Sequence, residues 1–128
     1  MAASLRDPRN GVRLVAERDG ALVGSASITR RRPGLCRHVA VLGVGVAPEQ
    51  RGRGIGRLLV ERALAWPRGP GRAEPAVTRV ELQVRADNPR AIALYESFGF
   101  AIEGTRRGAV RTLEGALIDE HIMLFTPR

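Results

Sequence analysis

The strongest constraint on the fold is the stretch 38–57, where an apolar run passes through glycines into a helical pattern. Residues 38–46 (HVAVLGVGV) are apolar on both faces, which is typical of a central buried strand. Pro48 ends this strand, and from Ile55 the apolar residues follow helical spacing. Between them, glycines occupy positions 52, 54 and 56. A strand that turns through glycines into a helix predicts an α/β fold with a ligand-binding turn at this point.

Other apolar patterns predict the remaining elements. Val12–Glu17 and Ala21–Ile28 flank Asp19-Gly20, which indicates a β-hairpin. The first helix has the apolar stripe Ile55, Leu58, Leu59, Ala63 and Trp66, and it ends at Pro67 before a Pro/Gly-rich loop, 69–75.

The second half of the chain predicts one more helix and three strands. Thr78–Ala86 alternates as a strand does, with Val80, Leu82 and Val84 on one face. Asn88-Pro89 begins a helix and Gly99 ends it. Strands are expected at Phe100–Thr105 and Ala116–Phe125. The chain of 128 residues has room for a single domain, 1–128, with its core at about 12–125.

The charge pattern favours a phosphorylated partner. All 21 basic residues are arginine and the net charge is +8, which suits a polyanion. Aromatic residues make up 4%, too few for base-stacking surfaces, so we expect no nucleic-acid partner. No apolar run suits a membrane span or a signal peptide, so we expect a cytoplasmic protein. The only cysteine, Cys36, cannot form an internal disulfide, and no metal site is expected.

The glycine turn has the features of a phosphate-binding loop. Glycines let backbone amides approach a ligand, and the following helix N-terminus adds unsatisfied donors and a positive dipole end. Arg51, Arg53 and Arg57 surround it with positive charge. Neither G-x-x-x-x-G-K-[ST] nor G-x-G-x-x-G is present. The alternative interpretation is a glycine-rich turn with solvated arginines.

Two motifs together resemble the GNAT superfamily of N-acetyltransferases. Arg51-x-x-Gly54-x-Gly56 resembles the R/Q-x-x-G-x-G/A pyrophosphate signature of that family. The segment 88–100 (NPRAIALYESFGF) resembles its N-x-x-A-x-x-L-Y-x-x-x-G-F motif. The C-terminal part is similar to branches that acetylate small amines or amino acids, in Glu103, Gly104, Arg106, Asp119 and Met123. The resemblance covers about Val12 to Phe125 and implies a mixed, mostly antiparallel central sheet with helices on both faces.

The resemblance also implies how acetyl-CoA would bind. The pantetheine arm would enter a gap between the strand ending at Val46 and the strand that contains Gln83. The residues implied are, for the arm, the backbone of Val44, Gly45 and Val46 together with Asn88, and for the pyrophosphate, the amides of Arg51, Gly52, Arg53, Gly54, Ile55, Gly56 and Arg57. Asn88 can equally be a simple helix cap.

Tyr95 is the candidate catalytic residue. A phenol near the thioester sulfur can protonate the departing thiolate, and family members that resemble this chain use this tyrosine in that way. The alternative is a core tyrosine on an apolar helix stripe. We assign no general base, because Gln83 stands where protein N-terminal acetyltransferases of the superfamily often have glutamate. Glu81, Asp119 and Glu120 are alternatives that would act through water.

The segment before the hairpin departs from the family pattern. Members usually have a strand and two helices there, and this chain has only Met1–Gly11. We therefore expect an exposed edge at Val12–Glu17 and self-association, most simply as a homodimer.

Three functions compete. The first is acetylation of a small amine or amino acid. The second is acetylation of a protein N-terminus or side chain, against which Gln83 counts. The third is a CoA-binding module with little catalysis.

Overall fold

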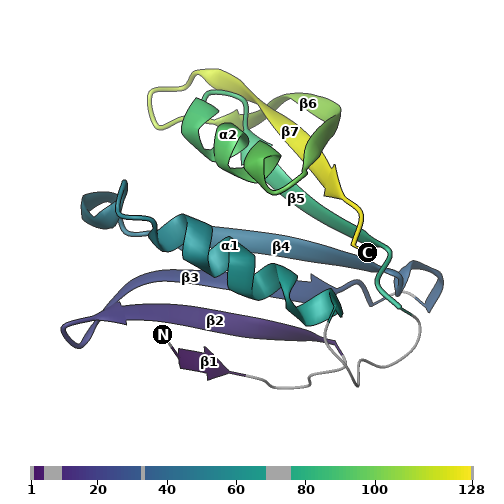
Figure 1. Ribbon diagram of the computed structural model, residues 1–128. Helices are drawn as coiled ribbons and strands as arrows, with labels where there is room; N and C mark the ends of the chain where they lie inside the picture. The colour runs from purple at the N-terminus through teal and green to yellow at the C-terminus, as the bar shows by residue number, and fades with distance from the viewer. Residues whose placement is uncertain (1, 5–9, 33, 69–75, 128) are drawn as a thin grey trace. The chain divides into compact units, whose positions relative to one another are not determined.

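The computed structural model describes residues 2–4, 10–32, 34–68 and 76–127 (Figure 1). It divides into two compact units, an N-terminal unit of residues 1–80 with 127–128 and a C-terminal unit of residues 81–126. The predicted mixed α/β fold with mostly antiparallel strands is confirmed. The predictions of a single domain and of helices on both faces of one sheet concern the arrangement of the two units together. Both stay predictions.

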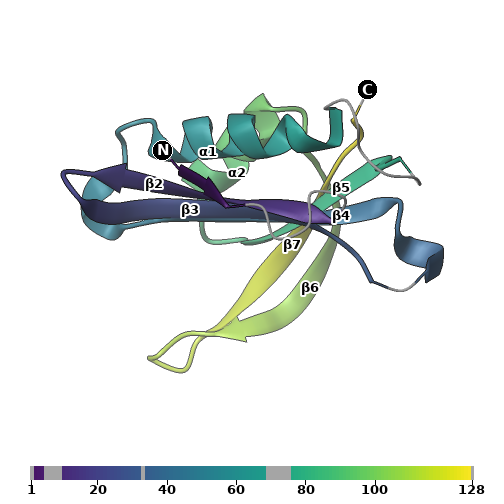
Figure 2. The same ribbon diagram turned by 90° about the horizontal axis from the view of Figure 1, so that it is seen from below.

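The N-terminal unit is an antiparallel sheet in the order β1-β2-β3-β4, covered by one helix. The predicted hairpin is confirmed, and its turn has φ of 52° at Asp19 and 80° at Gly20. Helix α1 contacts β2, β3 and β4 and lies along one face of these strands (Figure 2). The elements are β1 (Ala2–Ser4), β2 (Gly11–Arg18), β3 (Ala21–Arg30), β4 (Val39–Val46) and α1 (Ile55–Leu64), with 3-10 turns at Gly34–Cys36, Pro48–Gln50 and Trp66–Arg68.

Strand β1 corrects the expectation that no strand precedes the hairpin. Its three residues pair with residues 13–15 of β2. Three residues are too few to show a periodic pattern, so only the pairing with β2 identifies the strand. The edge of β2 is therefore partly covered, and self-association stays a prediction.

The buried face of α1 differs from the predicted stripe. Leu59 and Ala63 are buried as expected, but Leu58 is 39% exposed, whereas Val60 and Leu64 are buried. Residues 58–60 are consecutive apolar residues, so the sequence period allows more than one choice of inner face. Docking on β3 decides the choice.

The predicted strand Ala21–Ile28 is longer in the structure, because β3 ends at Arg30, which is buried. Its guanidinium donates to the carbonyl of Arg37 and lies 5.7 Å from the centre of the Trp66 ring. These contacts compensate for removing the charge from water.

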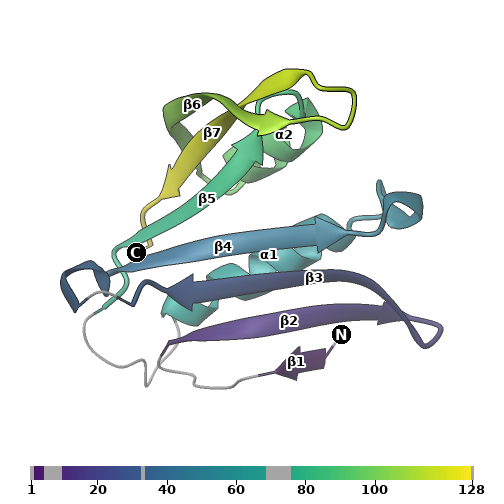
Figure 3. The same cartoon turned by 180° about the vertical axis from the view of Figure 1, so that it is seen from behind.

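The C-terminal unit contains most of β5 (Arg79–Arg85), α2 (Pro89–Ser97), β6 (Ala101–Arg111) and β7 (Leu117–Phe125), with strand order β5-β7-β6. β5 and β7 run in opposite directions (Figure 3). Its core includes Tyr95, Phe100 and Phe125, whose rings form a continuous cluster. β6 is longer than the predicted strand Phe100–Thr105, because pairing with β7 continues past an irregularity between Arg106 and Val110.

Candidate functional site

The glycine turn joins β4 to α1 with two glycines in the left-handed region. Gly52 and Gly54 both have φ of 80°. Gly54 is the N-cap residue of α1 and provides no side-chain cap. A side chain at either position would be strained, since L-residues rarely adopt this conformation. The turn therefore depends on glycine, and it leaves the first amides of α1 uncapped.

The amides of this turn are available to a ligand. Within the described part of the chain, no hydrogen bond is donated by the backbone N–H groups of Gly52, Arg53, Gly54, Ile55 and Gly56. The positive end of the α1 dipole lies at the same place. The side chains of Arg51, Arg53 and Arg57 are exposed around it. Adjacent free donors with positive charge suit a pyrophosphate, so these residues fit the group predicted from the sequence.

Of the three β4 residues predicted to bind the pantetheine arm, Val44 and Val46 have backbone groups that face away from β3. The amide of Ala47 donates to the carbonyl of Val23 in β3 at 2.8 Å. Because backbone groups alternate along an antiparallel strand, those of Gly45 also face β3, and those of Val44 and Val46 face the other edge. The backbone groups of Val44 and Val46 thus do not pair with β3. Gly45 does pair with β3, so it can help the pantetheine arm to bind only by leaving space where a side chain would be.

Gln50, directly before the turn, was not singled out from the sequence. Its Oε1 atom is buried and has no hydrogen-bond partner within the described residues. A buried acceptor without a partner is uncommon. No sequence pattern marks it, since it depends on how the 3-10 turn Pro48–Gln50 packs.

Tyr95 has a buried ring and an unpaired hydroxyl. Its side chain is 8% exposed and meets the Phe100 ring edge-on, with ring centres 6.0 Å apart. No described residue forms a hydrogen bond with its hydroxyl. The hydroxyl oxygen is not fully buried. Buried tyrosines usually bond their hydroxyl to the protein. Burial raises the pKa of Tyr95, so the phenol keeps its proton at neutral pH.

Asn88 is the N-cap of α2, as its sequence predicts. Its Oδ1 accepts a hydrogen bond from the amide of Ala91 at 3.2 Å. The cap uses the oxygen only, so the side-chain NH₂ group remains for a ligand.

We predict that Asn88→Ala lowers the free energy of unfolding by about 1 kcal/mol through loss of the cap. Asn88→Asp should keep the stability, because aspartate caps equally well. If the NH₂ group contacts the cofactor, Asn88→Asp should still weaken CoA binding. Thermal unfolding and calorimetric titration measure the two effects separately, and an unchanged melting temperature for Asn88→Ala would contradict the cap.

The acidic residues considered as bases have structural partners. Oδ1 of Asp119 accepts from the amide of Gly108 at 2.9 Å, and Glu120 pairs with Arg106 at 3.5 Å. Gln83 is exposed on β5. No base is assigned from these contacts.

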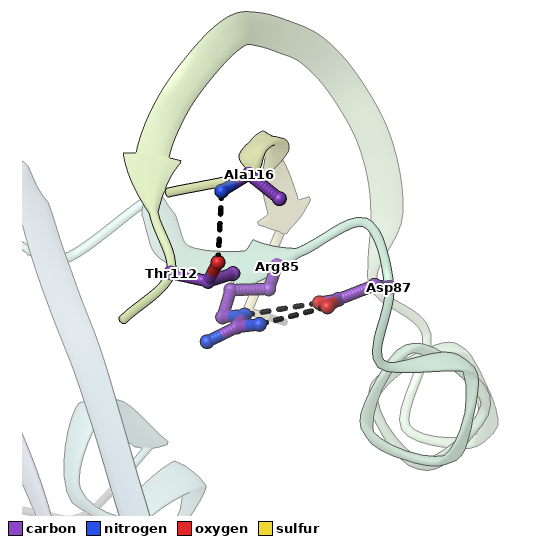
Figure 4. Close-up of polar contacts among 4 residues, drawn as sticks. All are labelled: Arg85, Asp87, Thr112 and Ala116. Atoms are coloured by element: carbon purple, nitrogen blue, oxygen red, sulfur yellow. Dashed lines mark hydrogen bonds and ion pairs between the residues drawn. The ribbon is translucent and has the colours of Figure 1, made fainter. Parts of the chain in front are cut away.

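The turn after β5 and the β6–β7 hairpin are held by local contacts (Figure 4). Arg85 forms two hydrogen bonds with Asp87, at 2.9 and 2.7 Å, which lower the pKa of Asp87 and raise that of Arg85. Thr112 Oγ1 accepts from the amide of Ala116 at 3.0 Å. Arg85 is therefore occupied by a neighbouring carboxylate.

The predicted site residues fall into two groups. Those between 44 and 57 lie in the N-terminal unit, whereas Asn88 caps α2 and Tyr95 lies on α2 in the C-terminal unit. The predicted loop 69–75 lies outside the described residues. In the part of the chain that is described, no cluster of three metal-ligating side chains is found, and no helix is long and apolar enough to cross a membrane.

Comparison with known proteins identifies relatives over most of the chain. Residues 1–100 match the Acetyltransferase (GNAT) family model. The chain is 43% identical over 94 residues to N-alpha-acetyltransferase RimI of Mycobacterium tuberculosis, which covers 72% of this chain and 53% of the relative. It is 35% identical over 121 residues to L-amino acid N-acetyltransferase AaaT of Escherichia coli, and this match covers 90% of this chain and 68% of the relative. The chain thus spans about half to two thirds of the length of these relatives.

A solved structure agrees with these sequence relatives. A GNAT-family acetyltransferase from Streptococcus pneumoniae superposes with a TM-score of 0.83 at 30% identity, covering 92% of this chain and 68% of that one.

Proposed function

The chain belongs to the GNAT acetyltransferase family, and we propose that it transfers an acetyl group from acetyl-CoA to the amine of a small molecule or amino acid. The observation that carries this proposal is the run of unpaired amides from Gly52 to Gly56 at the N-terminus of α1, with exposed arginines around it. The amino acid acceptor is supported by the similarity to AaaT, which extends over 90% of this chain. Cytoplasmic location and a homodimer stay predictions.

The proposed mechanism assigns three roles to this chain. Acetyl-CoA supplies a thioester whose C–S bond breaks as the amine nitrogen forms a C–N bond with the carbonyl carbon. The turn amides hold the pyrophosphate, and the backbone groups of Val44 and Val46, which face away from β3, align the pantetheine arm. Tyr95 donates its phenolic proton to the departing sulfur. The amine loses its proton to water.

We predict that acetyl-CoA raises the melting temperature of the chain. A ligand that binds only the folded state at 100 times its Kd adds about 2.7 kcal/mol, which corresponds to roughly 10 °C for a chain of this size. Differential scanning fluorimetry with acetyl-CoA up to millimolar concentration measures this shift. Pantetheine without the pyrophosphate is the control and should have little effect. No shift with acetyl-CoA at millimolar concentration would contradict the proposal.

Acetylation of a protein N-terminus is the second candidate, because N-alpha-acetyltransferase RimI of M. tuberculosis is 43% identical to this chain over 94 residues. Gln83 counts against it, since glutamine cannot act as a base. Acetyl-CoA consumption with a panel of amino acids, polyamines and peptides separates the two activities. Binding of acetyl-CoA without any turnover would indicate a CoA-binding module instead.

A further inference from the structure

The face of the N-terminal sheet opposite α1 has a shallow pocket of about 260 Å³. In Figure 3 this face of β2, β3 and β4 is turned toward the reader, with α1 behind the strands. The pocket is lined by Arg13, Val15, Leu22, Val23, Gly24, Ser25, Gly45 and Ala47.

Strand register places Arg13, Val15, Ser25 and Gly45 of this pocket on one face. A Cβ atom on Gly24 would meet Leu59 and Ile55 of α1, so position 24 faces the helix. Ser25, the next residue, therefore faces away from α1. Ser25 pairs with Val15 on β2 and with Gly45 on β4, and paired residues share a face. Arg13, two residues before Val15, lies on that face as well.

Arg13 provides the only charge in the pocket lining. Within the described residues its guanidinium has no ion pair or hydrogen bond, and its side chain is exposed. The nearest carboxylate on the same face of β2 is Glu17, which does not line the pocket. Ser25 adds a hydroxyl that is also without a partner in this part of the chain. An unpaired guanidinium beside a hydroxyl suits a carboxylate, which it can bind through two parallel hydrogen bonds.

The other end of the pocket lies on the strand that leads into the glycine turn. Gly45 and Ala47 belong to this end, and a Cβ atom on Gly45 would meet nothing within 4 Å. Neighbouring strands are about 4.8 Å apart, so about 10 Å separate β2 from β4, and the long Arg13 side chain can extend over β3. Val15, Leu22 and Val23 make the remaining lining apolar. The pocket thus combines a cationic end, an apolar wall and an open end at β4.

We propose that Arg13 binds the carboxylate of the acetyl acceptor, so that the acceptor is an amino acid with an aliphatic side chain. This inference rests on the proposed acetyl transfer, because it places the acceptor amine beside β4. The apolar wall receives the side chain, and the amine points toward the strand where the pantetheine arm is proposed to lie. Arg13 then selects acceptors that have a carboxylate and does not contact the amine.

The test compares Arg13→Ala with Arg18→Ala, which removes an exposed arginine of the same strand outside the pocket. CoA release is measured with L-leucine and with L-leucinamide, which lacks the carboxylate, at saturating acetyl-CoA. Arg13→Ala should lower kcat/KM for leucine at least tenfold through KM, because a charge-assisted pair is lost. Its kcat/KM for leucinamide should stay within about twofold of the parent. Arg18→Ala should change neither value by more than about twofold.

Equal losses with leucine and leucinamide, or no loss with either, would overturn the role of Arg13. A calorimetric titration of N-acetyl-L-leucine into the CoA-loaded protein measures binding to the pocket in the absence of turnover. Arg13→Ala should weaken this binding at least tenfold. Absence of such binding in the parent would also overturn the inference. A parent chain that acetylates no amine but binds N-acetyl-L-leucine through Arg13 would contradict the proposed function alone.

Discussion

Replacing Gly54 with valine is expected to weaken acetyl-CoA binding about 100-fold. Gly54 has φ of 80°, which a β-branched residue adopts only with strain, so the turn must change its backbone. The amides from Gly52 to Gly56, which we propose bind the pyrophosphate, would then change their directions. Each hydrogen bond to a charged group contributes about 1.5–3 kcal/mol, so losing one or two of them accounts for the expected change. Gly56→Val, inside the first turn of α1, should act in the same direction.

The chain contains a matched control for this substitution. Gly20, in the β2–β3 turn, has the same φ of 80°, and a Cβ atom at either glycine would meet nothing within 4 Å. Gly20→Val should therefore have a similar loss of stability but unchanged affinity for acetyl-CoA. Calorimetric titration gives the affinities, and thermal unfolding shows the strain.

Arg53→Ala tests whether charge or backbone holds the pyrophosphate. Its side chain is exposed, so salt partly screens its charge. We therefore expect the affinity for acetyl-CoA to fall by less than about tenfold. Equal losses for Arg53→Ala and Gly54→Val would show that the arginines, and not the amides, bind the anion.

The local elements of this fold could be predicted because each depends on neighbouring residues. Asp19-Gly20 predicts the hairpin through its positive φ values, and Asn88-Pro89 predicts the start of α2 through its cap. The glycine turn is likewise predicted, because closely spaced glycines between an apolar strand pattern and a helical stripe indicate a turn. These patterns place the candidate cofactor residues in the sequence before any packing is known.

Features that depend on packing could not be predicted in this way. The inner face of α1 follows from Gly24, whose missing side chain lets Leu59 approach β3. The burial of Arg30 requires Trp66, which is far away in sequence. The last part of β6 has no apolar alternation, and it is a strand because β7 pairs with it and Asp119 holds the amide of Gly108. The pocket beside Arg13 arises from strand register, which no single segment encodes.

The largest expected effect on turnover is that of Tyr95→Phe. This change keeps the ring and its contact with Phe100 but removes the phenolic proton. If Tyr95 protonates the departing sulfur, kcat should fall about 100-fold or more, the usual scale for losing a general acid. The melting temperature should barely change, because the hydroxyl has no hydrogen-bond partner within the described residues. Affinity for acetyl-CoA should also be unchanged.

Phe100→Leu is the complementary control, because it disturbs the packing of Tyr95 but keeps its hydroxyl. Phe100 is buried, so the substitution should lower the free energy of unfolding by about 1 kcal/mol or more. Turnover should fall far less than with Tyr95→Phe. A merely structural tyrosine predicts the reverse pattern, in which Tyr95→Phe retains its turnover.

The pH dependence adds a third readout for Tyr95. Burial raises the pKa of its phenol above the ordinary value, so the acid stays protonated from neutral pH to about pH 10. The ratio of parent to variant kcat should therefore be constant over this range and should decline only as the pH rises through the raised pKa of Tyr95. Steady-state rates at saturating amine and acetyl-CoA measure this ratio. A Tyr95→Phe variant within about twofold of the parent kcat at pH 7.5 would remove Tyr95 from the mechanism, since water would then protonate the thiolate equally well.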